Sequence, residues 1–158
     1  MPNKNTFSIK PIREVIDKYH FWKSIDPFAN SNKIANITND IDPQYWTDFN
    51  LDAIDFLKTF QESSVDTVLF DPPFSPRQVS ECYKKMWMTV NMQTTQSSFR
   101  WNLKKEIQRV TKKWAIVMSF GWNSWWIGKT KWFEQIEILI VAHWWWHNDT
   151  IVTVERKL

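Results

Sequence analysis

The chain has 158 residues, of which 43% are hydrophobic and 23% charged, and its net charge is +3. These values are ordinary for one soluble globular domain, and only the aromatic content stands out, with 12 Trp and 11 Phe. No apolar run approaches the ~20 residues that cross a bilayer, and no signal peptide is visible. The single cysteine, Cys82, excludes an internal disulfide and suits a reducing cytosol, while three scattered histidines give no metal-ligand spacing.

The hydrophobic pattern predicts strands that alternate with helices. Apolar residues at helical spacing predict helices at 11–19, 54–60 and 100–110, and a further helix that begins at Ser75-Pro76. Apolar and β-branched runs predict strands at 21–25, 34–38, 49–51, 65–70, 114–120, 133–145 and 150–156. The last two form a hairpin. The fold class is therefore α/β, with a mostly parallel sheet and an antiparallel pair at the C-terminal end, in one domain over 1–158.

Four successive predicted strands run into acidic residues. These are Asp26, Asp40, Asp52 and Asp71. The carboxyl ends of parallel strands meet at one edge of an open sheet, where ligands of such folds bind. We therefore expect a ligand site lined by hydrogen-bond acceptors.

The stretch from Val65 to Pro76 organises this edge. A buried strand stops at Asp71, because Pro72 and Pro73 cannot donate to a sheet ladder and each fixes φ near −65°. The result is a stiff turn that carries a carboxylate, two prolines and the ring of Phe74.

Asp71-Pro72-Pro73-Phe74 resembles the catalytic motif of methyltransferases that modify exocyclic amino groups of nucleobases. The resemblance implies that Asp71 and the Pro72 carbonyl accept hydrogen bonds from the amino group of an extruded base, and that the base stacks on Phe74. Asp-Pro-Pro points to adenine N6. Cytosine N4 is the alternative target.

Further segments resemble the cofactor motifs of the same family, in its small phage-encoded form, and imply S-adenosylmethionine as cofactor. Asp26-Pro27-Phe28 is similar to the Asp-Pro-Phe-x-Gly-x-Gly motif, and Asp40 takes the place of the acid that accepts the ribose hydroxyls. The resemblance implies cofactor contacts from Lys10, Pro11, Asp26, Phe28, Asn30, Asp40, Ile41, Asp52, Ala53 and Asp71. The implied fold is a Rossmann-like class I methyltransferase, and the implied location is the cytoplasm of a bacterial host.

The sequence departs from this motif at Asn30 and Asn32, where the family has glycines. Asparagine visits left-handed conformations more readily than other non-glycine residues, so we expect the turn to form. Its side chain, however, occupies space beside the cofactor. A non-catalytic nucleic-acid-binding subunit is therefore the competing interpretation.

Positive charge follows directly after the acidic turn. Residues 77–113 hold nine Lys and Arg but two Glu, which suits a phosphate-bearing partner, DNA before RNA. The candidates for nucleic-acid contact are Arg77, Lys84, Lys85, Arg100, Lys104, Trp122 and Asn123. No stretch is left for a target-recognition region. We therefore expect a second subunit, a single-stranded target or low specificity, and a homodimer through a Trp-rich surface is the preferred of these.

Overall fold

A computed structural model describes residues 6–20, 22–73, 77, 80–81, 84, 97–122, 126–143 and 149–158. The described helices are α1 (Lys10–Tyr19), α2 (Ala53–Lys58) and α5 (Ser97–Val110), with short 3-10 turns η1 (Thr6–Ser8), η2 (Pro43–Tyr45) and η3 (Lys129–Lys131). The strands are β1 (Ser24–Asp26), β2 (Ile37–Thr38), β3 (Val65–Phe70), β4 (Thr111–Gly121), β5 (Phe133–Val141) and β6 (Thr150–Lys157). None of the helices in these ranges is long and apolar enough to cross a membrane.

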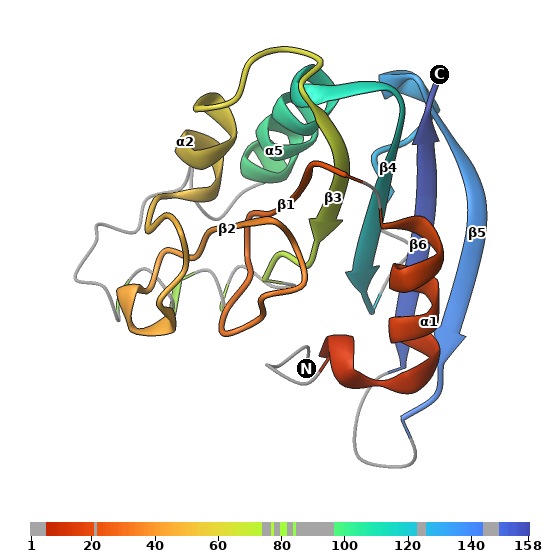
Figure 1. The fold of residues 1–158 in the computed structure, drawn as a ribbon, viewed down its shortest axis with the longest axis horizontal. Coiled ribbons are helices and arrows are strands. Elements are labelled where there is room, and N and C mark those ends of the chain that lie inside the picture. The colour runs from red at the N-terminus through yellow and green to blue at the C-terminus, as the bar shows by residue number, and fades with distance from the viewer. Residues whose placement is uncertain are drawn as a thin grey trace.

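The six strands form one mixed sheet in the order β2-β1-β3-β4-β6-β5 (Figure 1). The pairs β1–β2, β1–β3 and β3–β4 are parallel, and β4–β6 and β5–β6 are antiparallel. The predicted α/β fold with a C-terminal hairpin is confirmed. Because β1, β3 and β4 run in the same direction, their carboxyl ends share one edge, which lies at the bottom of Figure 1.

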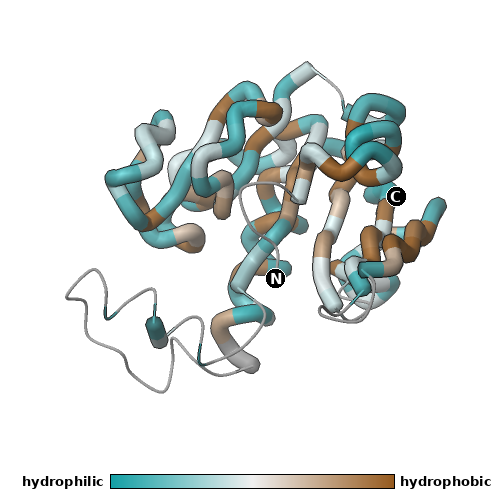
Figure 2. The backbone as a smooth tube through the Cα atoms, turned by 90° about the horizontal axis from the view of Figure 1, so that it is seen from below, coloured by the Kyte–Doolittle hydropathy of each residue, from teal (hydrophilic) through white to brown (hydrophobic). Residues whose placement is uncertain are grey.

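Helices cover both faces of the sheet, which makes three layers. Side chains alternate between the two faces of each strand, so Val68 and Phe70 pack with α2 and α5, whereas Leu69 packs with α1. In β4 likewise, Val117 joins the first core and Met118 the second. Figure 2 shows hydrophobic and hydrophilic residues alternating along the helices, as expected of elements with one buried side.

The predicted strand at 49–51 is wrong, because only an isolated bridge from Phe49 to Asn39 forms there. Side chains bond the backbone groups that a ladder would otherwise pair. The carboxylate of Asp48 accepts the Thr38 N–H at 2.8 Å, and the side chain of Asn39 bonds both the N–H and the carbonyl of Leu51 at 3.0 Å. Asp and Asn compete with regular structure in this way.

The first two strands are shorter than predicted for the same reason. The Ser24 N–H donates to the Asn36 side chain at 3.0 Å, and the Asn36 N–H donates to the Ser24 hydroxyl at 2.9 Å. These two bonds take the place of ladder hydrogen bonds before Ile37, so β2 begins only at that residue. β5 ends at Val141, and Trp144 and Trp145 of the predicted strand lie outside the described residues.

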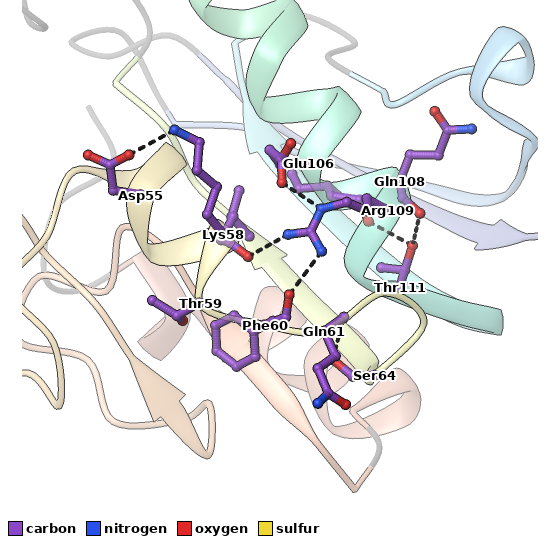
Figure 3. A network of polar contacts seen from close by, with 12 residues as sticks. Asp55, Lys58, Thr59, Phe60, Gln61, Ser64, Glu106, Gln108, Arg109 and Thr111 are labelled. Carbon is purple, nitrogen blue, oxygen red and sulfur yellow. Dashed lines mark hydrogen bonds and ion pairs between the residues drawn. The ribbon is translucent and has the colours of Figure 1, made fainter.

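Arg109 fastens α5 to the end of α2 (Figure 3). Its guanidinium donates to the carbonyls of Phe60 at 2.9 Å and Leu57 at 3.0 Å, and to the Glu106 carboxylate at 2.8 Å. The last carbonyls of a helix have no partner within the helix, so a cation there satisfies them and complements the helix dipole. This fastening fixes the segment that leads into β3.

We expect Arg109→Met to lower the free energy of unfolding by about 2–4 kcal/mol, because it leaves two carbonyls and a partly buried carboxylate without their donor. Urea unfolding monitored by circular dichroism measures this. Lys105→Met is the matched control, since Lys105 is exposed on the same helix. Equal stability of the two variants would show that the Arg109 contacts contribute nothing.

Candidate active site

The parallel strands bring three of the four predicted acids, Asp26, Asp40 and Asp71, to one edge, whereas Asp52 caps α2. Asp26 ends β1 and pairs in register with Thr38 of β2, so Asn39 and Asp40 follow at the same level. On its other side β1 pairs Ile25 with Val68, which places Asp71, three residues further along, just beyond the end of β3. Asp26 and Asp71 therefore follow neighbouring parallel strands.

Asp71 has a buried oxygen that lacks a hydrogen-bond partner. Its Oδ1 is one of three such side-chain atoms among the described residues. Burial raises the pKa of Asp71 well above its usual range, and the charge of Asp26 raises it further. A buried acceptor without a donor is costly in a folded protein, so it points to a group that binds there.

Asp26 is almost completely buried, with 1% of its surface exposed. Its Oδ1 accepts the Phe28 N–H at 2.9 Å. Burial raises the pKa of Asp26 to about 7, an effect that the charge of Asp40 reinforces and that the Phe28 hydrogen bond opposes. Because the pKa of each acid is raised, a bound cation or hydrogen-bond donor at this edge would stabilise the ionised forms of both.

The loop after β1 is held closed by Asn39 and Asp40. The Asn39 amide donates to the Pro27 carbonyl at 3.0 Å, and the Asp40 carboxylate accepts the N–H groups of Asn30 and Asp42, both at 2.9 Å. Asn30 has φ 52°, so the predicted left-handed turn without glycine is confirmed. Asp40 therefore has a structural role that the sequence did not reveal, in addition to its predicted contact with a cofactor.

The other predicted cofactor contacts surround this loop. Phe28 is half-buried, with its ring 6.0 Å from that of Phe70, and Ile41 is also half-buried. Asp52 caps α2 by accepting the Ile54 N–H at 2.9 Å, and Ala53 is buried behind it. Lys10 and Pro11 form the exposed first turn of α1, which lies toward the same edge as the ends of β3 and β4 (Figure 1).

On the substrate side, Pro72 is buried and Pro73 half-buried, while Phe74 lies outside the described residues. Arg77 and Lys84 are helical and exposed, and Arg77 pairs with Glu81 at 2.8 Å. Lys85 and Asn123 lie outside the described residues, as do Ser75 and Pro76 of the predicted helix start.

Three predicted nucleic-acid contacts are partly enclosed. Trp122 is half-buried directly after β4. Burial lowers the pKa of Arg100 and of Lys104, and the Lys104 ammonium donates to the Trp126 carbonyl. Lys104 thus ties α5 to the segment before η3.

Sequence reasoning missed two buried hydroxyls. Ser119 of β4 is paired in register with Thr153 of β6 and with Phe70 of β3, and neither hydroxyl oxygen has a hydrogen-bond partner. Because Ser119 pairs with Phe70, the residue before Asp71, both hydroxyls lie near the carboxyl ends of the parallel strands. The available signal was a polar residue inside an otherwise apolar strand.

Comparisons with solved structures identify the fold. TrmN from Thermus thermophilus superposes with a TM-score of 0.63 at 16% identity, over 94% of this chain and 48% of that one. The protein yhhF from Escherichia coli, which is described as a methyltransferase, superposes with a TM-score of 0.60 at 12% identity, over 99% of this chain and 90% of that one. A SAM-dependent methyltransferase from Methanosarcina mazei gives 0.55 at 12%, over 91% and 97% of the two chains.

The chain has the Rossmann-like fold of S-adenosylmethionine-dependent methyltransferases. It spans about half the length of TrmN. The sequence matches no protein-family model, and no curated protein matches it significantly. At such low identity the resemblance establishes the methyltransferase fold, and the chemistry rests on the residues at the strand ends.

The raised pKa of Asp26 predicts a pH-dependent stability. The ordinary value is 3.8 and the folded value about 7, so between these pH values the folded protein binds more protons than the unfolded chain. Stability therefore falls as pH rises through this window, by up to about 4 kcal/mol at 1.4 kcal/mol per pH unit. Asp26→Asn keeps an acceptor for the Phe28 N–H but does not titrate.

We expect urea unfolding between pH 4 and pH 7.5 to give a markedly flatter stability profile for Asp26→Asn than for the wild type. Asp55→Asn, at an exposed acid on α2, is the control and should follow the wild type. Parallel profiles for all three proteins would mean that Asp26 ionises normally.

Proposed function

We propose that the protein is an S-adenosylmethionine-dependent methyltransferase that acts on the exocyclic N6 amino group of adenine in DNA. One observation carries the proposal: in a methyltransferase fold, the Asp-Pro-Pro turn leaves a buried carboxylate oxygen of Asp71 without a donor. An amino group supplies the missing hydrogens. Adenine is preferred over cytosine N4 because of the Asp-Pro-Pro form of the motif, and DNA over RNA because of the same resemblance.

The reaction places a specific demand on the turn. The lone pair of an adenine amino nitrogen is delocalised into the ring, so the nitrogen is a weak nucleophile. Two acceptors directed at its hydrogens, the Asp71 carboxylate and the Pro72 carbonyl, favour the pyramidal nitrogen of the transition state. The two prolines fix these acceptors in advance, so little reorganisation is needed when the base enters.

The burial of Asp71 strengthens this effect. In a site with little water, a hydrogen bond to a carboxylate is stronger than in solution. The amino proton that is lost after methylation needs no strong base, because the methylated intermediate is acidic. We therefore assign no separate general base, and Asp71 acts as acceptor and orienting group.

The residues of the edge fit the proposed cofactor. S-adenosylmethionine supplies a methyl group from a positively charged sulfonium when bound. A sulfonium bound beside Asp26 and Asp71 would favour their ionised forms and so oppose the raised pKa of each, and Asp40 and Asp52 provide further acceptors for hydroxyl and amino groups. Phe28 and Ile41 line the loop with apolar surface beside them.

The nucleic-acid side of the proposal rests on charge. Arg77 and Lys84 are exposed cations that follow the catalytic turn, close in sequence to the acceptor that would take the base. A sequence-specific enzyme also needs an element that reaches base edges. A second copy or a partner subunit would supply it, and without one we expect low specificity.

A non-catalytic binding subunit is the second candidate, favoured by Asn30 and Asn32 in place of glycines. Isothermal titration calorimetry with S-adenosylmethionine separates the two. The catalytic proposal expects saturable binding, whereas no heat at millimolar cofactor would favour the binding subunit.

Asp71→Ala should lower the methylation rate at least about 100-fold, because it removes an acceptor that acts mainly on the transition state. Cofactor binding should be largely retained. The measurement is mass spectrometry of nucleosides from DNA and RNA incubated with the protein and labelled cofactor, which also identifies the base and the polymer.

Asp55→Ala removes an exposed acid far from the turn in sequence and serves as the matched control. Near wild-type methylation by Asp71→Ala would overturn the assignment of the acceptor. Methylated cytosine in place of adenine would keep the mechanism and change the substrate.

A further inference from the structure

A tryptophan-rich surface lies at the edge of the sheet opposite the candidate active site. We define it by three indoles and three cations: Trp101, Trp114, Trp132, Lys113, Lys131 and Arg156. The indoles are 53%, 56% and 66% exposed. Three large aromatic side chains held in water on one surface call for an explanation, since each would be more stable buried.

The strand register brings two of the indoles to one level. Ile116 of β4 and Glu134 of β5 both pair with Arg156 of β6. Trp114 and Trp132 each come two residues before those partners, so they flank the end of β6 with one strand between them. Two strand spacings separate them by about 10 Å.

The third indole adjoins them from α5. The Lys131 ammonium lies 3.9 Å from the centre of the Trp101 ring, which connects α5 to η3 directly ahead of Trp132. The start of β4, the turn before β5 and the C-terminal end of β6 lie together at the top of Figure 1. The surface therefore turns round this end of the sheet, with Trp101 and Lys131 on the face that α5 covers and Trp114 and Arg156 on the face that α1 covers.

The backbone at two of these positions is unusual. Trp114 has φ 69° and Trp132 has φ 63°, in the left-handed region that bulky residues rarely adopt. At Trp114 the strand register with β3 is broken between Thr111 and Ile116, so the irregular backbone displaces the indole from the ladder.

Cations accompany the rings. Lys113 and Arg156 lie 4.8 and 5.4 Å from the centre of the Trp114 ring. Both strained tryptophans directly follow a lysine in sequence, in Lys112-Lys113-Trp114 and Lys129-Thr130-Lys131-Trp132. Rings with ammonium and guanidinium groups beside them match a polymer that carries flat bases on a phosphate chain.

A second copy of the chain fits this surface less well. Arg156 is already paired with Glu134, but a two-fold contact places the same patch of each copy face to face, so Lys113 and Lys131 would meet their own kind. The net charge of +3 adds to this repulsion. Charge complementarity selects an anionic partner.

We propose that this surface binds single-stranded nucleic acid, with bases stacked on Trp101, Trp114 and Trp132 and phosphates near Lys113, Lys131 and Arg156. Single strands are favoured because stacking needs bases that are not already paired. Trp114 precedes Gly121, at the end of β4, by seven residues, or about 23 Å. A strand held here therefore reaches the acidic edge only if it is long enough to run along the sheet.

The test measures binding without cofactor, by fluorescence anisotropy of a labelled DNA strand of about 20 nucleotides. We expect the variant W101A/W114A/W132A to bind at least about tenfold more weakly than the wild type. Lys113→Gln and Lys131→Gln should each reduce the slope of log affinity against log salt by about 1.

Trp46→Ala is the matched control. Trp46 is 85% exposed and also left-handed, with φ 52°, but it follows η2 on the side of the acidic edge. It should bind as the wild type does. The corresponding triple Phe variant keeps aromatic faces and should recover most of the affinity, which separates stacking from a loss of folding.

Two results would overturn the inference. One is equal DNA affinity of the wild type and the triple Ala variant. The other is that the triple Ala variant differs from the wild type only in self-association, measured by sedimentation, or only in binding to vesicles that contain anionic lipid. Failure here is distinguishable from failure of the proposed methylation, because Asp71→Ala should bind the strand normally and the triple Ala variant should still bind S-adenosylmethionine.

Discussion

Two carboxyl groups buried at the ends of neighbouring parallel strands constrain the rest of this structure. Burial is the main cause that raises the pKa of both acids, and the charge of Asp26 raises the pKa of Asp71 further, so protons or a bound partner would stabilise this edge. The fold accepts this cost where β1 and β3 lie side by side in the sheet. Such a conflict between stability and placement is typical of functional sites.

The surrounding loop is adapted to hold those acids without glycine. Asn30 adopts the left-handed conformation itself, and Asp40 and Asn39 fix the loop by bonds to its backbone. The same polar side chains replace the ladder of an edge strand, through Asp48 and Asn39. The chain thus uses Asn and Asp where backbone hydrogen bonds would otherwise be needed, and Asp40 cannot change without also loosening the loop.

The long, strongly patterned elements could be predicted from the sequence. The strand at 65–70 has the predicted bounds, and α1, α5 and the final hairpin lie where hydrophobic spacing placed them. The edge near Phe49 could not be predicted, because its outcome depends on side chains that bond backbone groups ten and twelve residues away. The shared charge environment of Asp26 and Asp71 likewise depends on which strands are neighbours, and that follows from the sheet order.

The two edges of the sheet differ in chemistry for a reason that the topology supplies. Strands of one direction deliver their final residues to one edge and their first residues to the other, so β1 and β3 lead into acids, whereas β4 begins with Lys112 and Lys113. The antiparallel hairpin adds its own start and end to the cationic edge, through Trp132 and Arg156. On our proposal, the cationic edge binds the anionic polymer. A strand would then be anchored at a distance from the acids, and a flipped base, which carries amino hydrogens and no net charge, is the part of it that the acidic edge can accept.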